Sequence, residues 1–181
     1  YQSASYGTLG IQGAGIEREP GLTTPDAREL HSDLAMMADN GITHLAMEAS
    51  SHGLDQKRLE AVTVSVAGFT NLSREHLDYH PDMQAYFEAK ARLFTTILPD
   101  NGGAVINADD AWGQTLINRC RARGTSIISY GAAGDDLQLR RRSPYPDGQH
   151  LEFKVAGQKI EVDLPLAGAF QAANALCALG L

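Results

Sequence analysis

Ionisable side chains follow two apolar runs of the sequence, at the points where each run is predicted to leave a β-sheet. Glu48 comes directly after "ITHLAM", and His76 lies in "SREHLDYH", which follows "VTVSVAGF". A carboxylate and an imidazole presented by two strand ends could share a divalent cation such as Mg²⁺ or Mn²⁺. The competing interpretation is that Glu48 caps the turn after it and that His76 is an ordinary surface histidine.

A second metal interpretation uses His76 and His80. Two histidines four residues apart share one face of a helix and could bind zinc, which predicts a metal-dependent hydrolase. The sequence lacks the adjacent glutamate of zincins, and Pro81 interrupts the helix.

Lys90 lies in a predicted helix between Tyr86 and Phe94, which are four residues away on either side. This spacing puts the lysine at the edge of the apolar face, where burial would lower its pKa. A neutral amine there could react with carbon dioxide to form a carbamate, which binds metal as a carboxylate does. A solvated lysine on the polar face of the helix is the alternative.

The stretch "TTPD" provides two hydroxyls and free backbone N–H groups at a predicted helix N-terminus, which is a natural anion site. Thr24 is also predicted to cap this helix, with Pro25 at its first position and Gly41 at its end. Arg58 could pair with a carboxylate or a phosphate. The glycine-rich opening "YGTLGIQGAG" has no lysine after its glycines, so it is not a Walker A phosphate loop.

The elements that position these side chains alternate between strands and helices. Apolar periodicity and capping signals predict helices over residues 23–41, 81–98, 109–124 and 170–181, and strands over residues 42–49, 62–71, 103–107 and 125–131. The expected apolar faces are Ala27, Leu30, Leu34 and Met37 in the first helix, and Met83, Tyr86, Leu93, Phe94 and Ile97 in the second. This order indicates an α/β domain with a largely parallel sheet flanked by helices.

The pattern changes after Gly131. Three runs, at residues 137–143, 150–156 and 158–164, alternate polar with apolar residues and are separated by turn signals. We therefore predict a small antiparallel β subregion over residues 132–166, within one domain of 181 residues.

Composition narrows the function classes. The net charge of -7 argues against broad binding to nucleic acid or to anionic membranes. Two cysteines, Cys120 and Cys177, form no disulfide framework and suit a reducing compartment, so we expect a cytoplasmic protein. No apolar run is long enough for a transmembrane helix. The chain has no initiator Met and ends in an uncapped apolar helix, so we expect it to be a piece of a longer protein.

Four segments resemble one family in their order and spacing. "TTPDA", "AMEASSHGLDQKR", "FTNLSREHLDYHPDMQAYFEAKARLF" and "VINADD" are similar to motifs of the Mur ligases, and the resemblance covers nearly the whole chain. It implies that residues 1–181 are most of a P-loop-type central ATPase domain. The first strand, the phosphate loop and the first helix of that domain are missing, as are the uridine-binding and C-terminal domains.

The resemblance also implies a reaction. The most similar members are ATP-dependent amide ligases that add meso-diaminopimelate to UDP-N-acetylmuramoyl-L-alanyl-D-glutamate through an acyl phosphate, in peptidoglycan synthesis. We expect the same small-molecule substrates here, no nucleic-acid or membrane partner, a monomer, and no turnover by this chain alone. The alternatives are a lysine-adding or other Mur ligase, a metal-dependent hydrolase, and a non-catalytic binding module.

Residue roles follow from the resemblance in the same way. Glu48, His76 and a carbamylated Lys90 are the expected catalytic residues and Mg²⁺ ligands. The residues expected around the nucleotide-linked dipeptide are Thr23, Thr24, Ser50, Gln56 and Arg58. Those expected near ATP are Asn107, Gln171 and Asn174. Gln171 departs from the family, which commonly has asparagine at that position, and its amide stands one methylene farther from the backbone.

Overall fold

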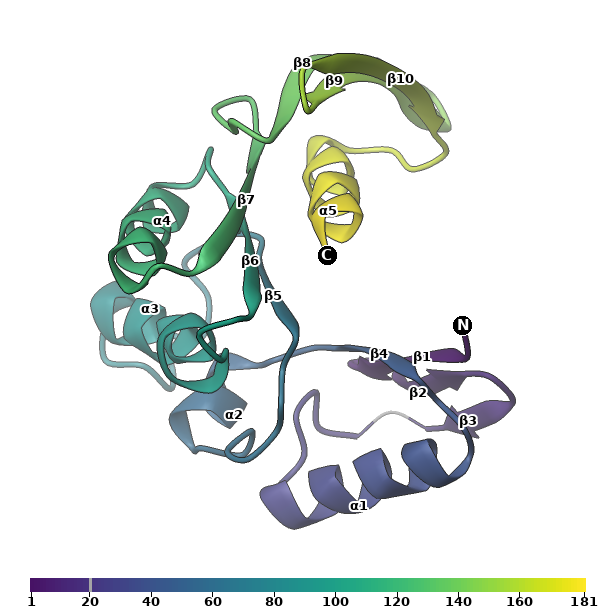
Figure 1. Cartoon of the computed structure of the whole chain (residues 1–181), viewed down its shortest axis with the longest axis vertical. Coiled ribbons are helices and arrows are strands. Elements are labelled where there is room, and N and C mark those ends of the chain that lie inside the picture. Colours follow the sequence, from purple (N-terminus) through teal and green to yellow (C-terminus); the bar gives the residue numbers. More distant parts are fainter. Residues whose placement is uncertain (20) are drawn as a thin grey trace. The chain divides into compact units, whose positions relative to one another are not determined.

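The structure is a computed structural model that describes residues 1–19 and 21–181 (Figure 1). The chain forms two compact units. Unit 1 comprises Tyr1–Thr63 and His76–Ile97, and unit 2 comprises Val64–Glu75 and Leu98–Leu181.

Unit 1 contains a four-stranded sheet covered by one long helix. The strand order is β3 (Ile16–Arg18), β2 (Gly10–Gly13), β1 (Ser3–Gly7) and β4 (His44–Met47). Strand β1 pairs in parallel with β4, whereas its pairing with β2 and that of β2 with β3 are antiparallel. Helix α1 (Ala27–Asp39) buries Leu30 and Met37 in the same cluster as β1 and β2.

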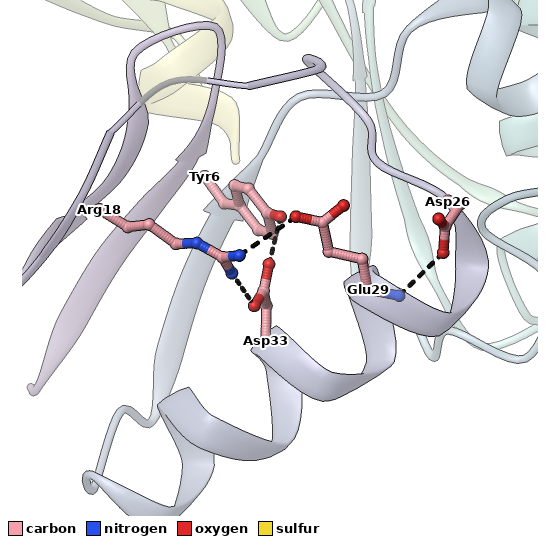
Figure 2. Close-up of polar contacts among 5 residues, drawn as sticks. All are labelled: Tyr6, Arg18, Asp26, Glu29 and Asp33. Carbon is pink, nitrogen blue, oxygen red and sulfur yellow. Dashed lines mark hydrogen bonds and ion pairs between the residues drawn. The ribbon is translucent and has the colours of Figure 1, made fainter.

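A polar network ties α1 to this sheet, as Figure 2 shows. Asp33 of α1 is only 5% exposed, and it accepts a hydrogen bond of 2.5 Å from the Tyr6 hydroxyl. Arg18 pairs with the other oxygen of Asp33 and also with Glu29. Burial and the Asp33 carboxylate raise the pKa of Tyr6, so this hydroxyl keeps its proton and remains a donor.

Three sequence predictions for α1 are wrong. The cap is Asp26, whose carboxylate accepts from the Glu29 N–H, because the hydroxyl of Thr24 is bonded elsewhere. Pro25 therefore precedes the cap, and the first helical position is Ala27. Ala27 is exposed, since it stands in the first turn where the helix has not yet reached the sheet, and the buried position falls on Asp33 instead.

Two further helices complete unit 1. Helix α2 (Ser51–Asp55) is capped by Ser50, and α3 (Met83–Arg92) by Asp82. The predicted helix at residues 81–98 is confirmed, and its last turn is a wider π turn, η1 (Leu93–Ile97). Tyr86 and Phe94 are buried as expected, and Phe87, which the apolar pattern missed, is buried completely.

Unit 2 contains a six-stranded mixed sheet. Strands β5 (Val66–Phe69), β6 (Gly103–Asn107), β7 (Ser126–Gly131) and β8 (Leu137–Tyr145) pair in parallel. Strands β9 (Gly148–Val155) and β10 (Gln158–Leu164) continue the sheet in antiparallel order beyond β8. The antiparallel strands therefore extend the parallel sheet.

Helices α4 (Ala111–Arg123) and α5 (Ala169–Gly180) lie on opposite sides of β6 and β7 (Figure 1). Val105 and Tyr130 pack with Leu176 and Cys177 of α5. A Cβ at Gly68 would lie 3.1 Å from the Cys177 sulfur, so glycine lets α5 approach β5. No helix in residues 1–19 and 21–181 is long and apolar enough to cross a membrane.

The α/β class with parallel strands flanked by helices is confirmed. The distribution of the strands is different from the expectation of one sheet, because β4 pairs with β1 and lies in a different sheet from β5. Strands β1, β2 and β3 were not predicted, since their glycines and polar residues hide the strand pattern.

Candidate functional site

The loop that carries His76 ends in a tight turn of unit 1. His76 has a φ of +57°, in the left-handed region that few non-glycine residues adopt. The N–H groups of Tyr79 and His80 both donate to the carbonyl oxygen of His76, at 3.2 and 2.9 Å. The turn leads directly to Asp82, the cap of α3, so the backbone fixes where the His76 imidazole leaves the chain.

Five rings gather around this turn: His52, His76, Tyr79, His80 and Tyr86. The ring of His52 lies 5.3 Å from His76, 4.0 Å from Tyr79 and 5.8 Å from His80, measured between centroids. Tyr86 of α3 makes a T-shaped contact with His76 at 5.7 Å and stacks on His80 at 5.0 Å with an interplanar angle of 14°. We call these five residues the ring cluster.

His80 is the buried member of the ring cluster, with 3% of its surface exposed. Its Nε2 has no hydrogen-bond partner within the described residues. Burial lowers the pKa of His80, and the neighbouring His52, His76 and Lys90 act in the same direction, whereas Asp55 opposes them. The side chain is therefore held as a neutral ring beneath Tyr86.

Lys90 approaches the same cluster from α3. Its Nζ lies 5.6 Å from the centroid of the Tyr86 ring, within the range of a cation–π contact, and the side chain is partly buried. Tyr86 thus contacts both His76 and Lys90, two of the three expected metal ligands.

Glu48, the third expected ligand, follows β4 and is exposed. The hydroxyl and the N–H of Thr8 both donate to its Oε2. The following turn is capped by Ser50, whose hydroxyl accepts from the Gly53 N–H. The alternative that Glu48 serves as that cap is therefore wrong.

Four of the five expected substrate-binding residues, Thr24, Ser50, Gln56 and Arg58, form one hydrogen-bonded group beside Glu48. The Thr24 hydroxyl donates to the backbone oxygen of Glu48 at 3.2 Å and accepts from the Ser50 N–H at 3.0 Å. Arg58 donates to the backbone oxygen of Thr24 at 2.7 Å, and its Nε and Nη2 donate to Gln56. Thr23 is partly buried and makes no hydrogen bond in the described part of the chain.

Tyr79 connects this group to the ring cluster. Gln56 donates to the Tyr79 hydroxyl at 3.1 Å, and that hydroxyl donates to Asp55 at 2.7 Å. The Tyr79 ring contacts His52, which contacts His76. A continuous series of contacts therefore runs from Thr24 through Arg58, Gln56 and Tyr79 to the ring cluster and Lys90.

Glu48 and His76 are the expected metal ligands of unit 1 with a donor atom still accessible. Thr8 holds Oε2 of Glu48 and leaves Oε1 available, and His76 offers an imidazole on an exposed turn. Within residues 1–19 and 21–181, no three His, Cys, Asp or Glu side chains are arranged to hold a metal. Neither the zinc interpretation nor the expected Mg²⁺ site therefore has a preformed set of three such ligands in this part of the chain, and in the zinc interpretation His80 would also have to leave its buried stack on Tyr86.

The residues expected near ATP lie in unit 2. Asn107 is 9% exposed, and both ends of its amide are in use, because Nδ2 donates to the Thr70 carbonyl and Oδ1 accepts from the Asp109 N–H. Gln171 and Asn174 lie on α5, the first partly buried and the second exposed. No hydrogen bond joins Asn107 to either side chain among the described residues.

Sequence reasoning missed two residues of the site. Tyr79 lies inside the segment "SREHLDYH" that was singled out but was given no role, and its place between His76 and His80 could have drawn attention to it. Thr8 offered no signal, since its contact with Glu48 spans 40 positions and depends on the unpredicted pairing of β1 with β4.

The chain matches the Mur ligase middle domain family over residues 1–181. It is 47% identical over 181 residues to a UDP-N-acetylmuramoyl-L-alanyl-D-glutamate–2,6-diaminopimelate ligase of Mesorhizobium japonicum and 48% identical to one of Agrobacterium fabrum. Both alignments cover 100% of this chain and 37% of the relative, so the chain spans little more than a third of their length.

Solved structures give the same picture. A structure of UDP-N-acetylmuramoyl-L-alanyl-D-glutamate–2,6-diaminopimelate ligase superposes with a TM-score of 0.86 and 33% identity, over 98% of this chain and 36% of the other. The apo form of L. casei FPGS superposes with a TM-score of 0.71 over 98% of this chain and 50% of the other, at 13% identity, which shows the fold alone.

Proposed function

Because this chain belongs to the Mur ligase family, we propose that it is the central ATPase domain of a longer ligase. The reaction proposed for that protein is the addition of meso-diaminopimelate to UDP-N-acetylmuramoyl-L-alanyl-D-glutamate. Identities near one half to ligases that carry these substrates in their names support this choice over a lysine-adding relative.

The observation that carries the proposal is the series of contacts in unit 1 that joins the expected substrate residues to the expected metal ligands. Thr24, Arg58 and Gln56 reach the ring cluster through Tyr79, and Tyr86 of that cluster contacts both His76 and Lys90. Such a juxtaposition suits a reaction in which an anionic substrate must lie beside a bound cation.

The proposed reaction has two steps. ATP phosphorylates the free carboxylate of the dipeptide, so that an acyl phosphate and ADP form. The amine of the incoming amino acid then attacks the acyl carbon, and the tetrahedral intermediate collapses with loss of phosphate and of the amine proton. Because the chain spans little more than a third of its relatives, we propose that it does not turn over alone.

Residues of unit 1 have distinct proposed roles. Glu48 and His76 would hold Mg²⁺, together with a carbamate on Lys90. When bound, Mg²⁺ neutralises charge between the two anionic reactants. The position of Lys90 supports it as the modified residue, because it is partly buried and lies beside Tyr86, which also contacts His76.

The substrate side relies on Thr24, Ser50, Gln56 and Arg58, with Thr23 beside them. Arg58 brings a positive charge to the group, and its bonds to Gln56 and to the Thr24 backbone hold it in one orientation. The dipeptide carboxylate and the nucleotide phosphates are anions of the kind that such a guanidinium recognises.

The nucleotide side is proposed for unit 2. Gln171 and Asn174 on α5 offer amide groups to the adenine of ATP. The amide of Asn107 is bonded to the backbone at Thr70 and Asp109, so its proposed role is to shape the two loops that follow β5 and β6. We expect a cytoplasmic monomer, because ATP and nucleotide-linked precursors are cytoplasmic substrates.

The carbamate provides the test. In bicarbonate at neutral pH, intact-mass measurement is expected to show a labile gain of about one CO₂, which Lys90→Ala abolishes. Lys57→Ala is the matched control, since Lys57 is an exposed lysine of the same unit. A chain with no gain, or a gain that survives in Lys90→Ala, would contradict the proposed role of Lys90.

A further inference from the structure

The glycine-rich opening of the chain has no part in the proposed function so far. In the structure, its residues 7–10 make the turn between β1 and β2. Strand β1 is the parallel neighbour of β4, with Tyr6 opposite Met47, and the Glu48 N–H donates to the Tyr6 carbonyl at 2.9 Å. This pairing brings Gly7 and Thr8 alongside Glu48.

Thr8 contacts one oxygen of the Glu48 carboxylate twice. Its N–H lies 3.3 Å from Oε2, and its hydroxyl donates to the same atom. A carboxylate held at one oxygen has lost most of its freedom to rotate, and its second oxygen, Oε1, has no hydrogen bond from the described residues. The contact therefore orients Glu48 and leaves one oxygen for another ligand.

Gly7 makes room for this arrangement. A Cβ at position 7 would lie 2.5 Å from Cδ of Glu48 and 2.7 Å from Oε1, well inside the closest approach of real side chains. Any residue other than glycine would push the carboxylate away. Gly7 leaves space for the Glu48 carboxylate, and Thr8 donates hydrogen bonds to it.

We propose that Gly7 and Thr8 form a cradle that fixes the Glu48 carboxylate, with Thr8 as a positioning residue for the divalent cation. The part of this inference that concerns the cation rests on the proposed function. Groups that orient a metal ligand from outside the coordination sphere commonly change metal affinity by roughly 10-fold to 100-fold. We expect an effect of this size from the Thr8 hydroxyl.

The cradle itself can be tested without metal, by measuring the mobility of the Glu48 side chain with ¹³C relaxation in the labelled chain. Glu48 is expected to be rigid in the unaltered chain, mobile in Thr8→Val, which keeps the shape and removes the hydroxyl, and rigid again in Thr8→Ser. A mobile Glu48 in the unaltered chain, or an equally rigid one in Thr8→Val, would overturn the inference.

The consequence for metal is tested by Mn²⁺ binding, followed by electron paramagnetic resonance. Thr8→Val should raise the dissociation constant by roughly 10-fold to 100-fold, and Thr8→Ser should restore it. Thr43→Val is the matched control: it removes another threonine hydroxyl of unit 1, which donates to the Gln2 backbone oxygen at the opposite end of β4 from Glu48. It should bind Mn²⁺ as the unaltered chain does.

Glu48→Gln distinguishes the proposed metal-ligand role of Glu48 from the proposed positioning role of Thr8. If it binds Mn²⁺ as well as the unaltered chain, Glu48 is not a metal ligand and that part of the proposed function fails, while the relaxation measurement still decides the cradle. If Glu48→Gln loses the ion and Thr8→Val keeps it with unchanged affinity, the positioning role of Thr8 is refuted. Thermal unfolding of each variant checks that the fold is intact.

Discussion

At the scale of single residues, His80 combines a buried ring nitrogen, which has no hydrogen-bond partner among the described residues, with a stacked contact to Tyr86. The unpartnered nitrogen lowers the stability of the fold, and the packing of the two rings offsets part of that loss. Phenylalanine would keep the ring and remove the unpartnered atom. We expect the free energy of unfolding of His80→Phe to lie within about 1 kcal/mol of that of the unaltered chain. His80→Ala is expected to lower it by about 2–4 kcal/mol, because it leaves a cavity.

The protonation of His80 should make the stability of the chain depend on pH. Because burial lowers the pKa of His80 in the folded chain, the unfolded chain takes up a proton first as the pH falls below about 6.5. The stability gained by burying His80 as a neutral ring is therefore complete above that pH. It is lost as the pH falls toward the lowered pKa of His80 in the folded chain. Urea unfolding at about pH 7.5 and about pH 5.5 should show a smaller loss in His80→Phe than in the unaltered chain. Equal losses would show that His80 does not carry this dependence.

At the scale of elements, the packing of α1 on its sheet depends on a charged group that the apolar pattern did not anticipate. Tyr6 on β1 and Arg18 on β3 both bond to the buried carboxylate of Asp33, as Figure 2 shows. Removing one partner leaves part of that carboxylate desolvated and unsatisfied.

Tyr6→Phe is expected to lower the free energy of unfolding by about 1–3 kcal/mol, because it deletes the hydroxyl and leaves the ring in place. Urea unfolding measures the change, with Tyr145→Phe as the control, since Tyr145 is exposed on β8. Matching midpoints for the two variants would mean that Arg18 alone satisfies Asp33.

Elements with a clear local signal were predicted well. Strand β10 follows strict alternation and α4 ends at Gly124, which adopts the left-handed conformation that favours glycine, so both were found within a residue or two of their bounds. Strands β1, β2 and β3 were missed because they are short, and because the parallel partner of β1 is β4, which lies far along the chain. Gly7 and Gly13 weaken any strand signal there, although Gly7 is required for the approach of Glu48.

The site was predictable in proportion to how local its contacts are. Tyr86 and Lys90 are one helical turn apart, so their spacing alone suggested the contact that the structure contains. The link from Arg58 through Gln56 to Tyr79 joins two segments more than twenty positions apart, and only the packing of α2 with α3 creates it.

At the scale of the whole molecule, both thiols belong to unit 2. Cys120 on α4 and Cys177 on α5 are buried, and burial raises the pKa of each. A protonated, inaccessible thiol reacts slowly with a disulfide reagent. We expect neither thiol to react at neutral pH in the native chain, and both to react in urea as unit 2 opens.

The unfolding of unit 2 can be followed by the reaction of the two thiols with a chromogenic disulfide at increasing urea concentrations. Trp112, the sole tryptophan of the chain, also lies in unit 2, so its fluorescence should change together with the thiols. Rapid reaction of either cysteine without denaturant would show that unit 2 opens far below its unfolding transition.

The backbone at His76 has a consequence for which amino acids the position can accept. A φ of +57° disfavours β-branched side chains and is tolerated best by glycine, asparagine, aspartate and histidine. Glycine has no side-chain donor atom for the proposed metal-ligand role of His76, so the torsion angle and that proposed role together leave three residue types. In a library of all substitutions at position 76, we therefore expect the backbone angle to decide which variants fold, and the side-chain donor to decide which of those bind metal. Aspartate and asparagine are the replacements that meet both requirements.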